Sequence, residues 1–138
     1  MSSWIHANGF MVITPYYKDE EIGKEIKEKI ANALGEIINC EDVTKTLACK
    51  HMPCGSEGSL KYEIIESEYS IYVAISGDLR DRYTEDLDKI EKWYKDAVEE
   101  ISNIDFCYLD RHVFTAYAEY GGRIVMYDDC LKIGVIRC

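Results

Sequence analysis

Residues 60–76, LKYEIIESEYSIYVAIS, decide the fold, because they predict a β-hairpin in the middle of the chain. Apolar and polar side chains alternate over residues 60–66 and again over 69–76, as they do in strands with one buried face. Residues 67–68 fit the turn between the two strands. The side chains expected to face the core from the second strand are Ile71, Val73 and Ile75.

A helix is predicted on each side of this hairpin. Over residues 18–38 apolar side chains recur every three or four positions, namely Ile22, Ile26, Ile30, Leu34 and Ile37, which is typical of a half-buried helix. A second helix is expected to begin with Thr84 or Asp81 as its N-cap and to run to about residue 101. Its predicted buried side chains are Leu87, Ile90, Tyr94, Ala97, Val98 and Ile101. On its exposed face, acid-to-base pairs four residues apart are predicted between Glu85 and Lys89, Asp88 and Lys92, and Glu91 and Lys95.

Further strands complete the pattern, at residues 4–14, 106–120, 123–127 and 131–136. The first strand ends before Pro15, and Gly9 in its middle suggests a bulge. Gly121-Gly122 fits a tight turn between two antiparallel strands. The resulting order β, α, β, β, α, β predicts a ferredoxin-like split βαβ sandwich, with two helices on one face of an antiparallel sheet and extra C-terminal strands. A chain of 138 residues fits one such domain over residues 1–138.

Composition restricts the class of protein. The chain is 47% hydrophobic and 30% charged, which excludes intrinsic disorder. With 16 Lys and Arg against 26 Asp and Glu, the net charge of -10 disfavours broad binding to nucleic acid or anionic lipid. No apolar run reaches the length of a membrane-spanning helix and no export signal is recognised, so we expect a cytosolic protein with reduced thiols.

The long loop expected over residues 39–58 contains a possible zinc site. Its soft and borderline ligands are Cys40, Cys49, His51 and Cys54. Four protein ligands would leave no open position for water, so such a zinc ion would be structural. The alternative is a set of ordinary thiols in a loop, and no other cofactor is expected.

Two glycine-containing segments resemble an anion site. Residues 55–58 (GSEG) and 76–82 (SGDLRDR) place glycine and hydroxyl groups where backbone amides can face an anion, and the second segment leads toward a helix N-terminus. The predicted ligand-binding residues are Trp4, Ser56, Ser76, Gly77, Asp78, Arg80 and Arg82. In the alternative interpretation, Asp78 and Asp81 neutralise both arginines and the segment only connects a strand to a helix.

Catalytic motifs are not recognised in this sequence. His6, His51 and His112 are scattered, and the sequence contains no G-x-S-x-G elbow and no H-E-x-x-H pair. His112 is expected on the outer face of its strand. We therefore predict no catalytic residue and no enzyme activity.

With Trp4 and Gly9 in the first strand, GSEG at 55–58, the segment 76–82 and Trp93 in the second helix, the chain resembles a family of small proteins from phages and prophages of gut Firmicutes. The cysteine-bearing loop and the long β-rich C-terminus depart from the pattern of that family. The resemblance implies a phage accessory protein that binds and blocks a component of host defence.

Three functions follow from these features. The first is a non-enzymatic sponge that sequesters a small nucleotide immune signal, as a homo-oligomer formed through an open, tyrosine-rich sheet face. The second is an acidic inhibitor of a nucleic-acid-binding host effector, of the anti-CRISPR or anti-restriction type. Residues 84–101 would mimic phosphates there, with three lysines against seven acids and a net charge of 3 - 7 = -4. The third and weakest is a hydrolase that uses Asp78, Asp81 or His112.

Overall fold

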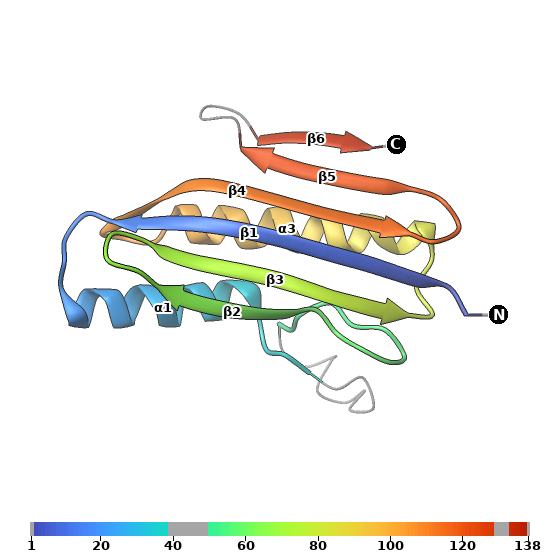
Figure 1. Cartoon of the computed structure of the whole chain (residues 1–138), viewed down its shortest axis with the longest axis horizontal. Helices are drawn as coiled ribbons and strands as arrows, with labels where there is room; N and C mark the ends of the chain where they lie inside the picture. The colour runs from blue at the N-terminus through green and yellow to red at the C-terminus, as the bar shows by residue number, and fades with distance from the viewer. Residues whose placement is uncertain (1, 39–49, 129–132, 138) are drawn as a thin grey trace.

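The computed structural model of this chain describes residues 2–38, 50–128 and 133–137 and confirms the predicted α+β fold (Figure 1). The elements are β1 (Trp4–Pro15), α1 (Glu20–Leu34), β2 (Lys61–Glu66), β3 (Ile71–Arg80), the 3₁₀ turn η1 (Thr84–Asp86), α3 (Leu87–Ser102), β4 (Cys107–Ala118), β5 (Arg123–Asp128) and β6 (Ile133–Arg137). The strands pair antiparallel in the order β2-β3-β1-β4-β5-β6. The first four strands form a split βαβ sheet, and β5 and β6 extend it beyond β4.

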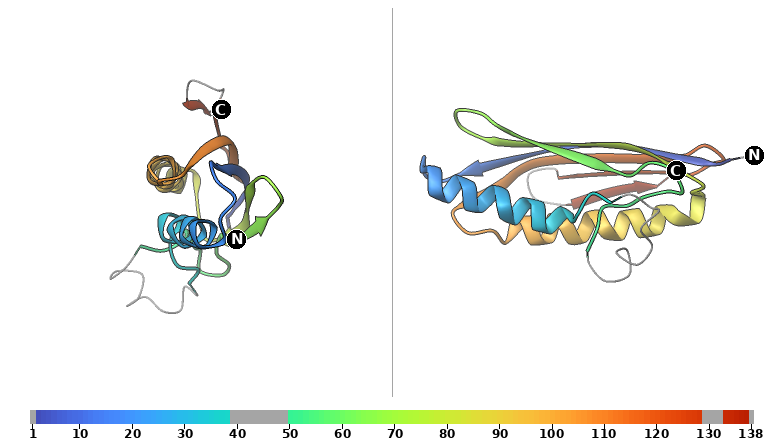
Figure 2. Two further views of the ribbon diagram at one scale, coloured as in Figure 1. Left: turned by 90° about the vertical axis from the view of Figure 1, so that its left-hand side faces the viewer. Right: turned by 90° about the horizontal axis from the view of Figure 1, so that it is seen from below.

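Both helices pack against one side of the sheet, and no helix or strand of the described ranges covers the other side (Figure 2). We call the uncovered side the open face. The six apolar side chains predicted for the buried stripe of α3 are all buried. The sheet contributes alternate residues to the same core, among them Ile5, Met11 and Val73. The periodicity of the sequence therefore identified the core-facing side of the second helix.

The first helix is shorter than predicted. It begins after Asp19, whose Oδ1 accepts hydrogen bonds from the backbone N–H groups of Glu21 and Ile22, as an N-cap does. It ends at Gly35, which has a φ of 104°, a conformation that glycine adopts without strain. Ile37 lies beyond this end and is 41% exposed, so its assignment to the buried stripe is wrong. Neither α1, with 15 residues, nor α3, with 16, is long and apolar enough to cross a membrane.

The second helix begins later than predicted. The α-helix begins at Leu87 after the 3₁₀ turn, and neither Thr84 nor Asp81 caps it. The Thr84 hydroxyl instead donates a hydrogen bond to the carbonyl of Gly121, at 2.6 Å. Segment 76–82 therefore does not lead directly into a helix N-terminus, because β3 continues to Arg80 and α3 begins seven residues later.

The irregularity between β1 and β4 is not at Gly9. The register shifts where β1 passes from Val12 to Ile13, whose partners on β4 are Arg111 and Leu109. Gly9 lies in regular pairing, and a Cβ atom there would lie 2.8 Å from Cδ2 of Phe114. Gly9 is therefore explained by close packing against that ring.

The position of His112 also corrects the sequence analysis. The bulge adds one residue to β4 and so shifts the alternation between Leu109 and His112, and His112 points into the core, where it is 4% exposed. Its Nδ1 lies 2.8 Å from the Tyr94 hydroxyl. Burial raises the pKa of Tyr94, so this hydroxyl keeps its proton. His112 is therefore part of a buried hydrogen bond between the sheet and α3.

Candidate functional site

The two glycine-containing segments lie side by side at the end of β3. The Ser56 N–H donates to the Arg80 carbonyl at 2.9 Å, and the Arg80 N–H donates to the Glu57 carbonyl at 3.0 Å. A Cβ atom at Gly58 would lie 2.1 Å from the Asp78 carbonyl oxygen. The backbone N–H groups of Ser56 and Arg80 are thus already bonded to backbone carbonyls. This favours a structural role for GSEG over an anion cradle.

The two predicted arginines point to different partners. The Arg80 guanidinium lies 3.0 Å from a Glu57 carboxylate oxygen, and its Nε–H donates to the Ser2 hydroxyl. The Nε–H of Arg82 donates to the Cys54 carbonyl at 2.7 Å. Asp81 accepts a hydrogen bond from Ser56 and forms no ion pair with either arginine. Both arginines therefore form hydrogen bonds or ion pairs, but their partners are not the two aspartates that the sequence analysis expected.

Four of the predicted ligand residues lie around a shallow hollow on the open face. Ser76, Gly77 and Asp78 line it, and the Trp4 ring stacks on His6 beside it. Ser56, Arg80 and Arg82 are not among the residues that line this hollow. The structure therefore does not bring the predicted set together at one location.

His6 is the residue of this hollow that the sequence analysis missed. Its Nδ1 lies 2.6 Å from Asp78 Oδ1, and its Nε2 lies 2.8 Å from Glu119 Oε1. These partners are 72 and 113 positions away in the chain. Alternation in β1 could have placed His6 beside Trp4 on the open face, but only the sheet topology places both carboxylates against the ring.

The two carboxylates stabilise the charged form of His6. The hydrogen bond to Asp78 and then that to Glu119 raise the pKa of His6 above 6.5, and burial opposes them in part. A raised pKa in the folded state stabilises the fold fully below the unfolded value near 6.5, and this contribution is lost as the pH rises through the folded value. His6 is therefore expected to stay an imidazolium to a higher pH than an unperturbed histidine does.

Replacing His6 by glutamine is expected to lower the free energy of unfolding more below pH 6.5 than at a pH well above the folded pKa. Urea unfolding of both proteins at the two pH values measures this difference. Asn8→Ala, in the same hollow but without a titrating group, is the control and should cost the same at both. A difference that increases with pH would contradict the charged state assigned to His6.

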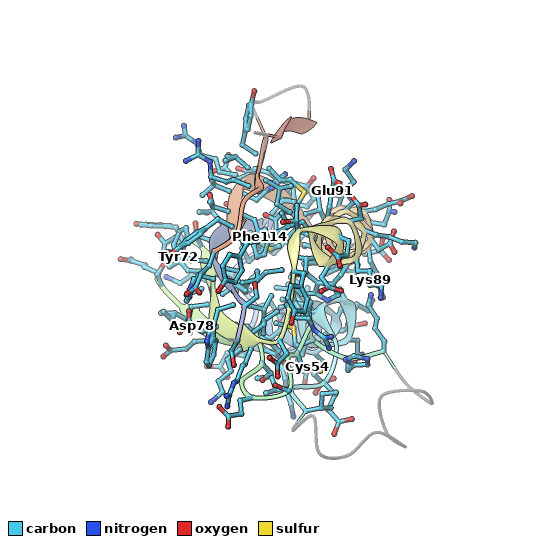
Figure 3. All side chains as sticks on the ribbon, turned by 90° about the vertical axis from the view of Figure 1, so that its right-hand side faces the viewer. Cys54, Tyr72, Asp78, Lys89, Glu91 and Phe114 are labelled. Carbon is cyan, nitrogen blue, oxygen red and sulfur yellow. The ribbon has the colours of Figure 1, made fainter. Side chains whose placement is uncertain are left out.

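A second cavity, which we call the Trp93 cleft, lies on the other side of the molecule. It has a volume of about 220 Å³ and lies between residues 51–54 and the first turns of α3. Its apolar walls are Pro53, Leu79, Ile90 and Trp93, and its polar side chains are His51, Arg82, Asp86 and Lys89. Figure 3 shows Lys89 on the helix side of the molecule, whereas Tyr72 and Asp78 lie on the open side.

The Trp93 cleft is built by fixed groups. The Trp93 indole N–H donates to the Leu34 carbonyl at 2.8 Å, which ties α3 to the end of α1. His51 Nδ1 lies 2.8 Å from the Met52 carbonyl, so this nitrogen carries a proton and the ring orientation is set. The bond from Arg82 to Cys54 uses one of five guanidinium N–H donors and holds the planar group at the cleft.

Lys89 differs from the other lysines of α3. Lys92 pairs with Asp96, and Lys95 pairs with Glu91 as predicted. Glu85 lies in the 3₁₀ turn before α3 and does not pair with Lys89. No ion pair of Lys89 is found among the side chains within the described ranges.

A shallower hollow continues from the cleft along α3. It shares His51, Lys89 and Trp93 with the cleft and adds Lys50, Lys92 and Asp96. Lys50 pairs with Glu100 and Lys92 with Asp96, at 2.7 and 2.8 Å. These pairs also engage acids of the predicted phosphate-mimicking surface, which weakens the argument for mimicry by α3.

The zinc prediction falls partly outside the structure. Cys40 and Cys49 lie outside the described residues. His51 orients one ring nitrogen toward Met52, and Cys54 is disulfide-bonded, so the prediction of reduced thiols is wrong at this position. A sulfur in a disulfide is not a thiolate ligand. No group of three or more candidate metal ligands is found within residues 2–38 and 50–128, and the zinc site stays a prediction that requires the reduced form of Cys54.

Comparisons with known proteins found no family model, no curated protein and no solved structure that matches this chain. The argument for function therefore rests on the site itself.

Proposed function

We propose that this protein binds a small phosphorylated ligand of the nucleotide class in the Trp93 cleft and sequesters it without turnover. The observation that carries the proposal is the convergence of Arg82, Lys89 and His51 on one aromatic-walled cavity in a chain of net charge -10. This is the sponge expected from the sequence, with its site moved from the glycine-containing turns to the helix side.

The polar groups of the cleft suit a phosphate. A guanidinium presents a planar set of donors that matches phosphate oxygens, and an ammonium adds a point charge. Among the described residues, Asp86 is the one acidic side chain that lines the cleft, and its Oδ2 accepts a hydrogen bond from the Tyr83 N–H at 2.8 Å. The local balance of charge is therefore favourable to an anion, unlike that of the chain as a whole.

The size and walls of the cleft suit part of a nucleotide. A volume of about 220 Å³ is below the range of about 300–1,000 Å³ that holds a drug-sized ligand. The cleft would enclose one portion of the ligand, and the rest would extend along the hollow by Lys50 and Lys92. Trp93 borders both parts and offers a surface on which a base can stack.

The two other functions have less support. The hydrolase would need its acid–base groups together, but Asp78 lies on the open face and His112 is buried on the helix side. The acidic inhibitor would need unpaired carboxylates on α3, but Glu91, Asp96 and Glu100 are in ion pairs. Sequestration in the cleft is the function that the geometry supports best.

The test compares Lys89→Ala with Arg80→Ala, which removes the same charge outside the cleft. Native mass spectrometry and calorimetry with cyclic dinucleotides and ADP-ribose derivatives should detect a retained, chemically unaltered nucleotide. Lys89→Ala is expected to weaken its binding by about ten- to hundredfold, as the loss of one charge-assisted hydrogen bond does. Arg80→Ala is expected to bind as the unaltered protein does.

Three results would contradict the proposal. Loss of binding in Arg80→Ala with unchanged binding in Lys89→Ala would return the site to the glycine-containing turns. A cleaved nucleotide would indicate an enzyme. No binding of any nucleotide in the panel would exclude this ligand class and favour a protein target.

A further inference from the structure

The open face carries a continuous band of apolar side chains across four strands. Phe10 on β1 lies between Ala74 of β3 and Val113 of β4 in the register of the sheet, and Tyr72 of β3 lies beside Ile65 of β2. The Phe10 and Tyr72 rings stack with centroids 5.5 Å apart. These are the sheet positions at which a solvated antiparallel face would carry polar residues.

Members of this band are strongly exposed although they are large. The relative exposures of Phe10, Ile65 and Val113 are 41%, 43% and 45%. Tyr108 and Tyr117, further along β4, are exposed to a similar extent. Contiguous apolar surface of this kind on a soluble fold marks an interaction site.

The charge of the open face differs from that of the whole chain. Its bases are Lys61, Arg80, Arg111 and Arg123, together with His6, and its acids are Glu63, Asp78, Asp110 and Glu119, together with Glu57, which pairs with Arg80. A chain of net charge -10 repels its own copies at most approaches. On this face the charges are balanced, so two copies can meet there without that repulsion.

The charged groups also surround the apolar band in a self-complementary way. Asp78, Glu119, Arg80 and Arg123 lie toward the Trp4 end of β1, whereas Asp110 and Arg111 lie near Val12, toward its other end. Both ends carry both signs of charge, so a two-fold arrangement with the β1 strands of the two copies antiparallel can bring acids of each copy to bases of the other. An uncharged centre with a polar rim is the usual anatomy of a protein interface.

We propose that the open face is a self-association surface, on which a second copy of this chain packs sheet against sheet. The Trp93 cleft lies on the helix side and stays open in such a dimer (Figure 3). The surface is therefore independent of the ligand site, and each can fail without the other.

The test measures the mass of the full chain in solution by sedimentation or light scattering at micromolar concentrations. The unaltered protein is expected at twice 15.9 kDa. Phe10→Glu would bury a charge at the centre of the interface and should weaken the dimer by about a hundredfold or more. Val113→Glu, on the neighbouring strand, should have the same effect.

Tyr69→Glu is the matched control. It also exchanges an exposed aromatic for a carboxylate, but Tyr69 lies in the β2–β3 turn and is 76% exposed. It should leave the dimer intact. Far-ultraviolet circular dichroism checks that each variant is folded. A monomeric unaltered protein, or folded Phe10→Glu and Val113→Glu variants that still dimerise, would overturn the proposal.

Discussion

Replacing Phe114 by alanine is expected to lower the free energy of unfolding by about 3 to 5 kcal/mol, the usual cost of truncating a buried phenylalanine. Phe114 has no exposed surface and lies between the sheet and the helices (Figure 3). Its ring stacks on Tyr94 with centroids 4.5 Å apart and meets the edge of Trp93 at 5.9 Å. The backbone of Gly9 closes the space on the other side, so little can move in to fill the cavity.

Urea unfolding followed by fluorescence measures this loss, and Val113→Ala is its control. Val113 is the preceding residue of the same strand, but its side chain points to the open face. Its truncation should cost well under half as much, because exposed apolar atoms lose little contact with the core. Equal costs for the two variants would mean that Phe114 is not the centre of the core.

The helix periodicity predicted much of this core because each helix buries one stripe. All six positions assigned to the buried side of α3 are buried. The error at Ile37 arose because the apolar spacing continues past Gly35, where the helix ends. Spacing indicates a face, but a positive-φ glycine terminates the helix even where the spacing persists.

The strands were harder to assign because alternation fixes a face only up to the next irregularity. One bulge between β1 and β4 lets both Leu109 and His112 lie on the helix side. The expectation that His112 is on the outer face failed at this point. No residue in the sequence identifies such a bulge unambiguously, because its position depends on which strand pairs with β4.

The candidate site was harder still to predict from local sequence patterns. The sequence identified Arg82, but Lys89 was assigned to an ion pair with Glu85 on an exposed helix face. That pairing assumed α-helical spacing, and Glu85 is in a 3₁₀ turn instead. The Trp93 cleft itself arises where residues 51–54 meet α3, a contact between distant segments that no local pattern encodes.

The second large effect on stability is expected from a substitution in the GSEG motif. Gly58→Ala should lower the free energy of unfolding by about 2 to 5 kcal/mol, because two costs add. Gly58 has a φ of 77°, where an L-residue is strained by about 1 to 2 kcal/mol. Its new Cβ would also lie 2.1 Å from the Asp78 carbonyl oxygen, and such overpacking adds about 1 to 3 kcal/mol.

Gly121→Ala separates the two costs. Gly121 also has a positive φ, 120°, but a Cβ there meets no atom within 4 Å in the part of the chain that the structure describes. It should therefore show only the conformational cost, and urea unfolding of both variants gives the packing cost by difference. Equal losses would refute close packing as the reason for glycine at position 58. A larger loss in Gly58→Ala would mean that the motif resembling an anion cradle holds the end of β3 in place, because its backbone already occupies the space a ligand would need.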